Sequence, residues 1–139
     1  PDPLWSRGLG DVYKRQGDTV QALTLPAGHL VVAAGFEVVT SATMNTGTDA
    51  TAALGFTGGD VDEFVAAFDI DGASDGAYAP QVAITGMTVS ASDDTIDLLL
   101  AGSGASFTAG KLRVYAMLMD VSNTGTSKQA NEVARDYLA

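Results

Sequence analysis

The chain has 139 residues with a formal net charge of −10, a single His and no Cys. The missing Cys excludes disulfides and thiol chemistry, and the lack of an apolar run of about 18 residues excludes a membrane-spanning helix. The excess of acidic residues argues against binding to a nucleic-acid backbone, and an apolar content of 46% is too high for a disordered tail. These totals indicate an acidic globular domain whose partners are neither nucleic acid nor membrane.

The first 16 residues carry a signature unrelated to folding. Residues 6–16 read SRGLGDVYKRQ, which corresponds codon by codon to a transposase-based adapter used in DNA sequencing. We therefore expect residues 1–16 to be a translated adapter outside the fold, read from a metagenomic sample, and residues 17–139 to form a single domain. A natural basic N-terminal arm is the alternative. Without residues 1–16 the chain has four basic and 15 acidic residues, a formal charge of −11.

Apolar residues recur at every second position in four segments, which predicts strands with one buried face. The alternating sets are Leu30, Val32, Ala34, Phe36 and Val38; Ala50, Ala52, Leu54 and Phe56; Ile96, Leu98 and Leu100; and Leu112, Val114, Ala116 and Leu118. Residues 19–25 and 82–89 are less regular strand candidates. Clusters of Gly, Asn, Asp and Ser between these segments suit tight turns. We expect an all-β fold, an antiparallel β-sandwich that is jelly-roll-like.

Two segments depart from the two-residue period. In residues 60–69, Phe64, Val65 and Phe68 have a helical spacing behind two acidic residues, which predicts a short helical turn. In residues 127–139 an apolar stripe predicts a short C-terminal helix. A helix of about a dozen residues is marginal unless it docks, either on its own domain or on a neighbouring subunit.

Carboxylates offer the main candidates for a metal site. Asp69, Asp71 and Asp75 occupy the first, third and seventh positions of an acidic, Gly-containing loop, a spacing that suits oxygen coordination of calcium. Asp60 and Asp62 lie close enough in sequence to contribute. The loop lacks three features of an EF-hand, and acidic loops of this kind are also found as solvated turns. Calcium is therefore the one cofactor that the sequence leaves open.

No motif for catalysis stands out, and we expect that the protein is not an enzyme. The solitary His29 follows a turn, and no nucleophile motif accompanies it. Asp94 and Asp97 are close enough in sequence to suggest an acid/base pair. Their place at the start of an alternating strand is equally typical of surface charges, so a hydrolase would require both side chains to converge in a cleft.

The last strong strand is apolar on both faces. Tyr115, Met117 and Met119 form its second face, and Val133 and Tyr137 lie on the apolar stripe of the expected C-terminal helix. A strand of this kind is either buried between two layers or covers a subunit contact, where Met is an adaptable filler. These five residues are our candidates for an interface in a homo-oligomer.

Five segments in a fixed order carry a resemblance to a known family. They are residues 26–40 (PAGHLVVAAGFEVVT), 50–72 (ATAALGFTGGDVDEFVAAFDIDG), 94–102 (DTIDLLLAG), 108–122 (TAGKLRVYAMLMDVS) and 132–139 (EVARDYLA). Over residues 19–139 the chain resembles the uncharacterised small virion structural proteins of marine tailed bacteriophages. Because its motifs are strands and turns, the resemblance implies no active site.

The resemblance implies a component of the virion that is made in the host bacterial cytoplasm. It implies a capsid decoration protein or a head or tail accessory protein, whose partners are other virion proteins and further copies of itself. A family-like ending further suggests that Ala139 is the natural C-terminus. The alternative function is a calcium- or carbohydrate-binding β-sandwich module that uses Asp60, Asp62, Asp69, Asp71 and Asp75.

Overall fold

The structure is a computed structural model, and it describes residues 6–8, 17–47, 49–82, 89–103 and 106–121. The described residues contain eight strands: β1 (Ser6–Gly8), β2 (Thr19–Leu25), β3 (His29–Met44), β4 (Ala50–Gly55), β5 (Val65–Asp69), β6 (Ala77–Tyr78), β7 (Asp94–Gly102) and β8 (Phe107–Asp120). They form two four-stranded sheets with the orders β1-β8-β3-β6 and β2-β7-β4-β5, and every pairing is antiparallel. The predicted all-β, antiparallel fold is confirmed.

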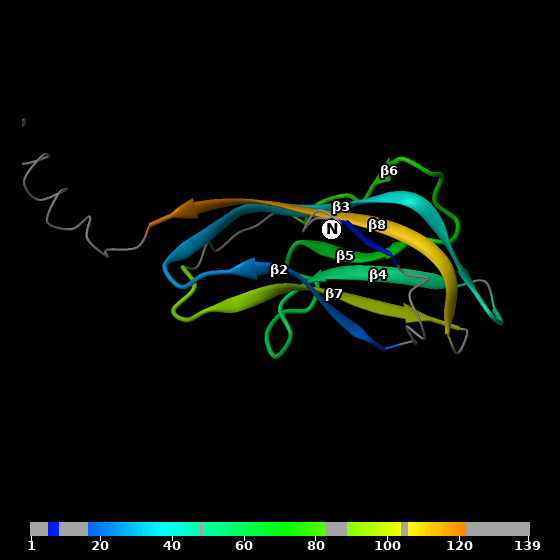
Figure 1. Cartoon of the computed structure of the whole chain (residues 1–139), viewed down its shortest axis with the longest axis horizontal. Coiled ribbons are helices and arrows are strands. Elements are labelled where there is room, and N and C mark those ends of the chain that lie inside the picture. The colour runs from blue at the N-terminus through cyan, green and yellow to red at the C-terminus, as the bar shows by residue number, and fades with distance from the viewer. Residues whose placement is uncertain (1–5, 9–16, 48, 83–88, 104–105, 122–139) are drawn as a thin grey trace, which may run out of the picture.

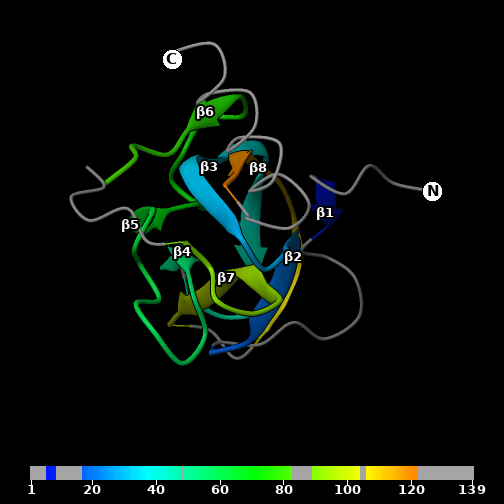
Figure 2. The same ribbon diagram turned by 90° about the vertical axis from the view of Figure 1, so that its left-hand side faces the viewer.

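The two sheets form two layers. In Figure 1 the long strands β3 and β8 lie above β2, β4 and β7, and Figure 2 shows the same layers from one end. The space between the layers is filled by side chains that are 0% exposed: Phe36, Val38, Leu112 and Val114 from one sheet, and Leu54, Ile96, Leu98 and Leu100 from the other. Burying one such side chain stabilises the fold by about 1.5–3 kcal/mol. Most of the predicted alternating sets are therefore confirmed as core.

The antiparallel pair of β3 and β8 departs from simple alternation near the start of β3. The register shifts between Val31 and Ala33, where β3 has one more residue than β8 opposite. This bulge moves the alternation by one position, so Val31 is buried, at 6% exposure, while Leu30 and Val32 are only half-buried. The expectation that Leu30 and Val32 belong to the fully buried face was wrong for this reason.

The expectation of a helical turn over residues 60–69 was also wrong. Residues 65–69 form the edge strand β5, and a turn region precedes it. β5 pairs with β4 through Leu54↔Val65 and Ala52↔Phe68, with a register shift between them. The extra residue on β5 lets Val65 and Phe68 face the same side, so a bulged strand imitates the three-residue spacing of a helix. Pairing with β4 satisfies the backbone of β5 that a helix would have satisfied internally.

Some expectations fall wholly or partly outside the described residues. The C-terminal helix, with Val133 and Tyr137, lies in residues 122–139, and most of the strand expected at 82–89 lies in residues 83–88. Val89 forms an isolated antiparallel bridge with Leu30. The backbone of β1, inside the segment expected to be an adapter, pairs with Lys111–Arg113 of β8, and the origin of residues 1–16 stays a prediction. Within the described part of the chain, no helix has the length and apolar character needed to span a membrane.

Candidate protein-contact surface

The outer face of the β3–β8 strand pair carries exposed apolar residues that the sequence singled out. Cross-strand partners in an antiparallel pair lie on the same face, and Met117 lies opposite Ala33 while Met119 lies opposite Leu30. Met117 is 63% exposed and Met119 is 52% exposed. Their predicted place on the second face of the strand is confirmed, and neither side chain is buried within its own domain. We call Leu30, Ala33, Met117 and Met119 the methionine patch.

Tyr115 continues this face but is fixed by the fold. It lies opposite Gly35, where an added Cβ would lie 2.5 Å from the Tyr115 hydroxyl oxygen. The side-chain amide of Gln81 donates a hydrogen bond of 3.2 Å to that oxygen, and the Tyr78 ring lies 6.2 Å away between centroids. Tyr115 is half-buried as a result. Tyr115 borders the methionine patch and is held by these contacts, whereas the side chains of Met117 and Met119 are exposed.

A charged pair lies beside Tyr115 on the outer face of β3 and β8. Arg113 donates a hydrogen bond of 2.8 Å from Nη1 to Glu37 Oε2, and the two residues are cross-strand partners. Arg113 and Lys111 are the basic residues of residues 17–121. In a chain of net charge −10, these two basic residues lie on the same strand as Met117 and Met119. The methionine patch itself contains no charged side chain.

The three calcium candidates each accept hydrogen bonds from the backbone. Asp69 Oδ1 accepts from the backbone N–H groups of Gly72 (2.7 Å) and Asp71 (3.1 Å). Asp71 Oδ1 accepts from the Ala50 backbone at 2.9 Å, and Asp75 Oδ1 accepts from the Ser41 backbone at 2.8 Å. These bonds join the acidic loop to β3 and β4. They give each carboxylate a role in holding the loop.

Hydrogen bonds shift the pKa values of three exposed carboxyl groups in this region, those of Asp60, Asp62 and Asp69. The backbone N–H of Gly72 holds the pKa of Asp69 below its usual value of 3.8. The hydrogen bond with Asp62 lowers the pKa of Asp60, while the same bond and the neighbouring charge of Asp60 raise the pKa of Asp62. Among the described residues, no group of three or more His, Asp or Glu side chains gathers closely enough to hold a metal ion. The calcium site at Asp69, Asp71 and Asp75 stays a prediction.

Asp94 and Asp97 do not meet. β7 pairs with β2 residue by residue from Asp94 to Leu99, and the extra residue at the bulge is on β2, so β7 side chains three positions apart point to opposite faces. Asp94 is exposed and lines an open depression with Leu25 and Phe56, whereas Asp97 is 5% exposed on the outer face of its sheet. The cleft that a hydrolase would require at these two residues is not formed by them.

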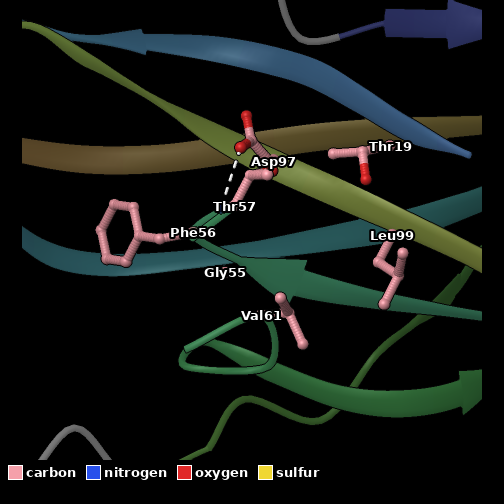
Figure 3. Close-up of a pocket in the computed structure, with 7 residues that line it drawn as sticks. All are labelled: Thr19, Gly55, Phe56, Thr57, Val61, Asp97 and Leu99. Atoms are coloured by element: carbon pink, nitrogen blue, oxygen red, sulfur yellow. Dashed lines mark hydrogen bonds between the residues drawn. The ribbon is translucent and has the colours of Figure 1, made fainter. Parts of the chain in front are cut away.

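Figure 3 shows what covers Asp97. The loop after β4 folds back over the sheet, and a small cavity of about 30 Å³ remains between Thr19, Phe56, Val61, Asp97 and Leu99. Asp97 Oδ2 accepts a hydrogen bond of 3.0 Å from the Thr57 backbone, and its Oδ1 accepts one of 2.6 Å from Thr95 Oγ1. Asp97 is therefore a structural anchor for the loop. The burial of Asp97 could not be predicted from the sequence, because Asp97 alternates with the apolar inner-face residues and so was expected on the surface.

Comparisons with known proteins give one structural likeness. No protein-family model matches the sequence, and no curated protein matches it. Among solved structures, the chain is similar to one in the acidic stable capsid structure of Helicobacter pylori bacteriophage KHP30, with 14% identity and a TM-score of 0.46. The match covers 82% of this chain and 98% of that chain. A likeness of this degree is no argument for a shared function.

Proposed function

We propose that the protein is a non-catalytic structural component of a bacteriophage virion, either a capsid decoration protein or a head or tail accessory protein. Its work is to bind other virion proteins through exposed apolar strand surface. The main observation behind this proposal is the strand order, and the methionine patch is the surface through which we expect the partner to bind. The five sequence segments that resemble virion proteins of marine tailed phages support the same role.

The strand order supports the finer assignment of a jelly roll. In an eight-stranded jelly roll built from two Greek keys, strands 1, 8, 3 and 6 form one sheet and strands 2, 7, 4 and 5 form the other. The orders β1-β8-β3-β6 and β2-β7-β4-β5 agree with this arrangement, and the remaining orders β8-β3-β6 and β2-β7-β4-β5 still agree with it when β1, which lies in the expected adapter, is left out. Viral capsid domains are among the main users of the jelly roll, alongside lectins and cupins. Because one fold serves several functions, the contact surface has to decide among them.

The methionine patch favours protein contact over the alternative of a calcium- or carbohydrate-binding module. Exposed Met117 and Met119 present polarizable, adaptable surface without charge, which suits a protein partner. The acidic side chains that would bind calcium are engaged with the backbone of β3, β4 and their own loop. A partner that covers the patch would bury surface that the domain leaves open.

The test is to locate the protein in particles. An antibody raised against the purified chain is applied to purified virions of the phage that carries the gene, and gold labelling is scored on heads and tails. We expect label on intact virions, and its position distinguishes decoration from tail accessory. Detection in infected-cell lysate but not in washed virions would contradict the proposal.

The calcium alternative has its own measurement. A ligand that binds only the folded state raises the melting temperature. We expect equal melting temperatures in millimolar calcium chloride and in chelator. A calcium-dependent rise that disappears in the double variant Asp69→Asn, Asp71→Asn would favour the binding module instead.

A further inference from the structure

The second edge of β8 is largely open among the described residues. One edge pairs with β3 along the whole length of β8, from Met44↔Phe107 to His29↔Asp120. On the other edge β1 pairs only with Lys111–Arg113. Beyond that point, no described strand pairs with this edge at Val114–Met119. The backbone N–H and C=O groups of such an edge form a template for another strand.

This stretch of β8 lacks the devices that normally protect an edge. Residues 114–119 read VYAMLM, without a charge, a Pro or a Gly. Protected edges usually carry Lys, Pro or a bulge, because a bare apolar edge pairs with other chains. Burial also declines along the strand: Val114 is 0% exposed, Ala116 and Leu118 on the same face are half-buried, and Met119 is 52% exposed. In the described part of the chain, the outer face and one edge of this segment are thus open to a partner, while its inner face packs on the core.

We propose that a second copy of this chain adds its own β8 antiparallel to this edge, about a twofold axis that passes through Met117. This assignment rests on the proposed structural role and names its first partner. The pairing places Met117 opposite Met117 of the second copy, Tyr115 opposite its Met119, and Ala116 opposite its Leu118. Each pair joins two apolar side chains on the same face.

The choice of a second copy follows from symmetry and charge. A twofold contact uses the same patch on both chains, so it needs a segment that is complementary to its own reverse, as residues 115–119 are. Two chains of net charge −10 repel, and they approach best where the segment is uncharged and Lys111 and Arg113 lie nearby. The pairing of β1 illustrates that this edge accepts a strand through its backbone.

The register can be tested by cross-linking because the full chain has no Cys. Directly paired residues have Cα atoms about 4.5–5.5 Å apart, within disulfide range. We expect Met117→Cys to form a covalent dimer with itself on mild oxidation. Tyr115→Cys and Met119→Cys should each stay monomeric on a denaturing gel alone, and should cross-link to each other when mixed. The control is Ala67→Cys, an exposed position on the edge strand β5 of the other sheet.

A charge exchange at the axis gives an independent measurement. Met117→Lys and Met117→Glu each place two like charges opposite each other, so sedimentation should shift from dimer to monomer mass for either variant. An equal mixture should recover the dimer, while Ala67→Lys and Ala67→Glu should leave it intact. A wild-type chain that is monomeric at high micromolar concentration, or a dimer whose cross-links do not follow the 117–117 and 115–119 pattern, would overturn the proposal.

The outcome is separable from that of the virion assay. If the chain is monomeric but the antibody detects it on virions, the strand pairing is wrong and the proposed structural role is retained. If the chain forms a dimer with the expected register but is missing from virions, the strand pairing is retained and the proposed structural role is wrong.

Discussion

β7 and β8 have similar sequence patterns but opposite outer surfaces. Both alternate apolar residues on their inner faces, and the inner residues Leu98 of β7 and Val114 of β8 are 0% exposed. On the outer faces the exposure is the opposite of what polarity predicts: Asp97 on β7 is 5% exposed, whereas Met117 on β8 is 63% exposed. Hydrophobicity alone would have placed the Met inside and the Asp outside.

The difference lies in what covers each strand. β7 lies between β2 and β4, and the loop that follows β4 folds over its outer face. β8 is covered on its inner face by the other sheet, while on its outer face the small side chain of Ala33 is the described cross-strand partner of Met117. A buried carboxylate is tolerated when its oxygens are hydrogen-bonded, as those of Asp97 are. An exposed Met is retained where a partner can cover it.

The largest expected loss of stability comes from shortening a core side chain on the inner face of β7 or β8. Leu98→Ala removes a side chain that is 0% exposed, and we expect a loss of about 2–5 kcal/mol in the free energy of unfolding. Leu118→Ala on β8 removes a half-buried side chain and should cost less than half as much. Urea denaturation of the two variants measures both. Equal losses would show that the end of β8 is as well covered as the centre of β7.

The next effect comes from removing the anchor over β7. Asp97→Ala leaves the Thr57 N–H without its partner, and we expect a loss of about 1–3 kcal/mol in the free energy of unfolding. Asp97→Asn retains a side-chain oxygen that can accept one of the two hydrogen bonds, so its loss should be smaller. Hydrogen exchange at the Thr57 amide reports the anchor directly. Unchanged exchange in Asp97→Ala would rule out the anchoring role.

The sequence predicted most of the sheets because their information is local. Inner-face residues such as Leu54, Leu98 and Leu112 follow a strict alternation and are buried as expected. The errors occur at bulges. Val31 is buried out of phase because the register shifts between it and Ala33, and the spacing of Val65 and Phe68 in a bulged strand resembles that of a helix. A bulge depends on pairing with another strand, which the local pattern does not contain.

The candidate site could be predicted only in part. The apolar second face at Tyr115, Met117 and Met119 was evident in the alternation, but the difference between them was not. Tyr115 is fixed because Gly35 lies opposite and makes room for its ring, which depends on the register of β3. The burial of Asp97 depends on a loop that folds back from the end of β4. Both features arise from residues distant in sequence.

The loop itself offers a smaller and more local change. A Cβ at Gly55 would collide with the carbonyl oxygen of Asp60 and the backbone of Val61, so Gly55→Ala must push the loop away from β7. We expect a loss of about 1–2 kcal/mol, at the lower end for overpacking because the displaced segment is at the surface. Gly59→Ala is the matched control, since its Cβ would lie 3.5 Å from the Phe56 side chain, an ordinary contact. Thermal unfolding compares them, and equal melting temperatures would mean that the loop is not seated on Gly55.

The smallest effect concerns an exposed carboxylate, the counterpart of the buried Asp97. The pKa of Asp69 in the folded protein is lowered from 3.8, first by the Gly72 backbone N–H and then by Asp71. An acid whose folded-state pKa is depressed stabilises the fold above its unfolded pKa, and that contribution is lost as the pH falls through the folded-state pKa. Solvent screening keeps it small because Asp69 is exposed.

Asp69→Asn isolates this contribution, because the amide oxygen still accepts from Gly72 but does not titrate. We expect wild type to be slightly more stable than the variant at neutral pH, with the difference shrinking as the pH falls below 3.8. The Asp60–Asp62 pair titrates alike in both chains and cancels in the difference. Denaturation curves from neutral pH to below pH 3.8 measure it. A difference that stays near zero over that range would mean that the turn at Gly72 needs only an oxygen acceptor, so that Asp69 could be replaced by its amide without loss.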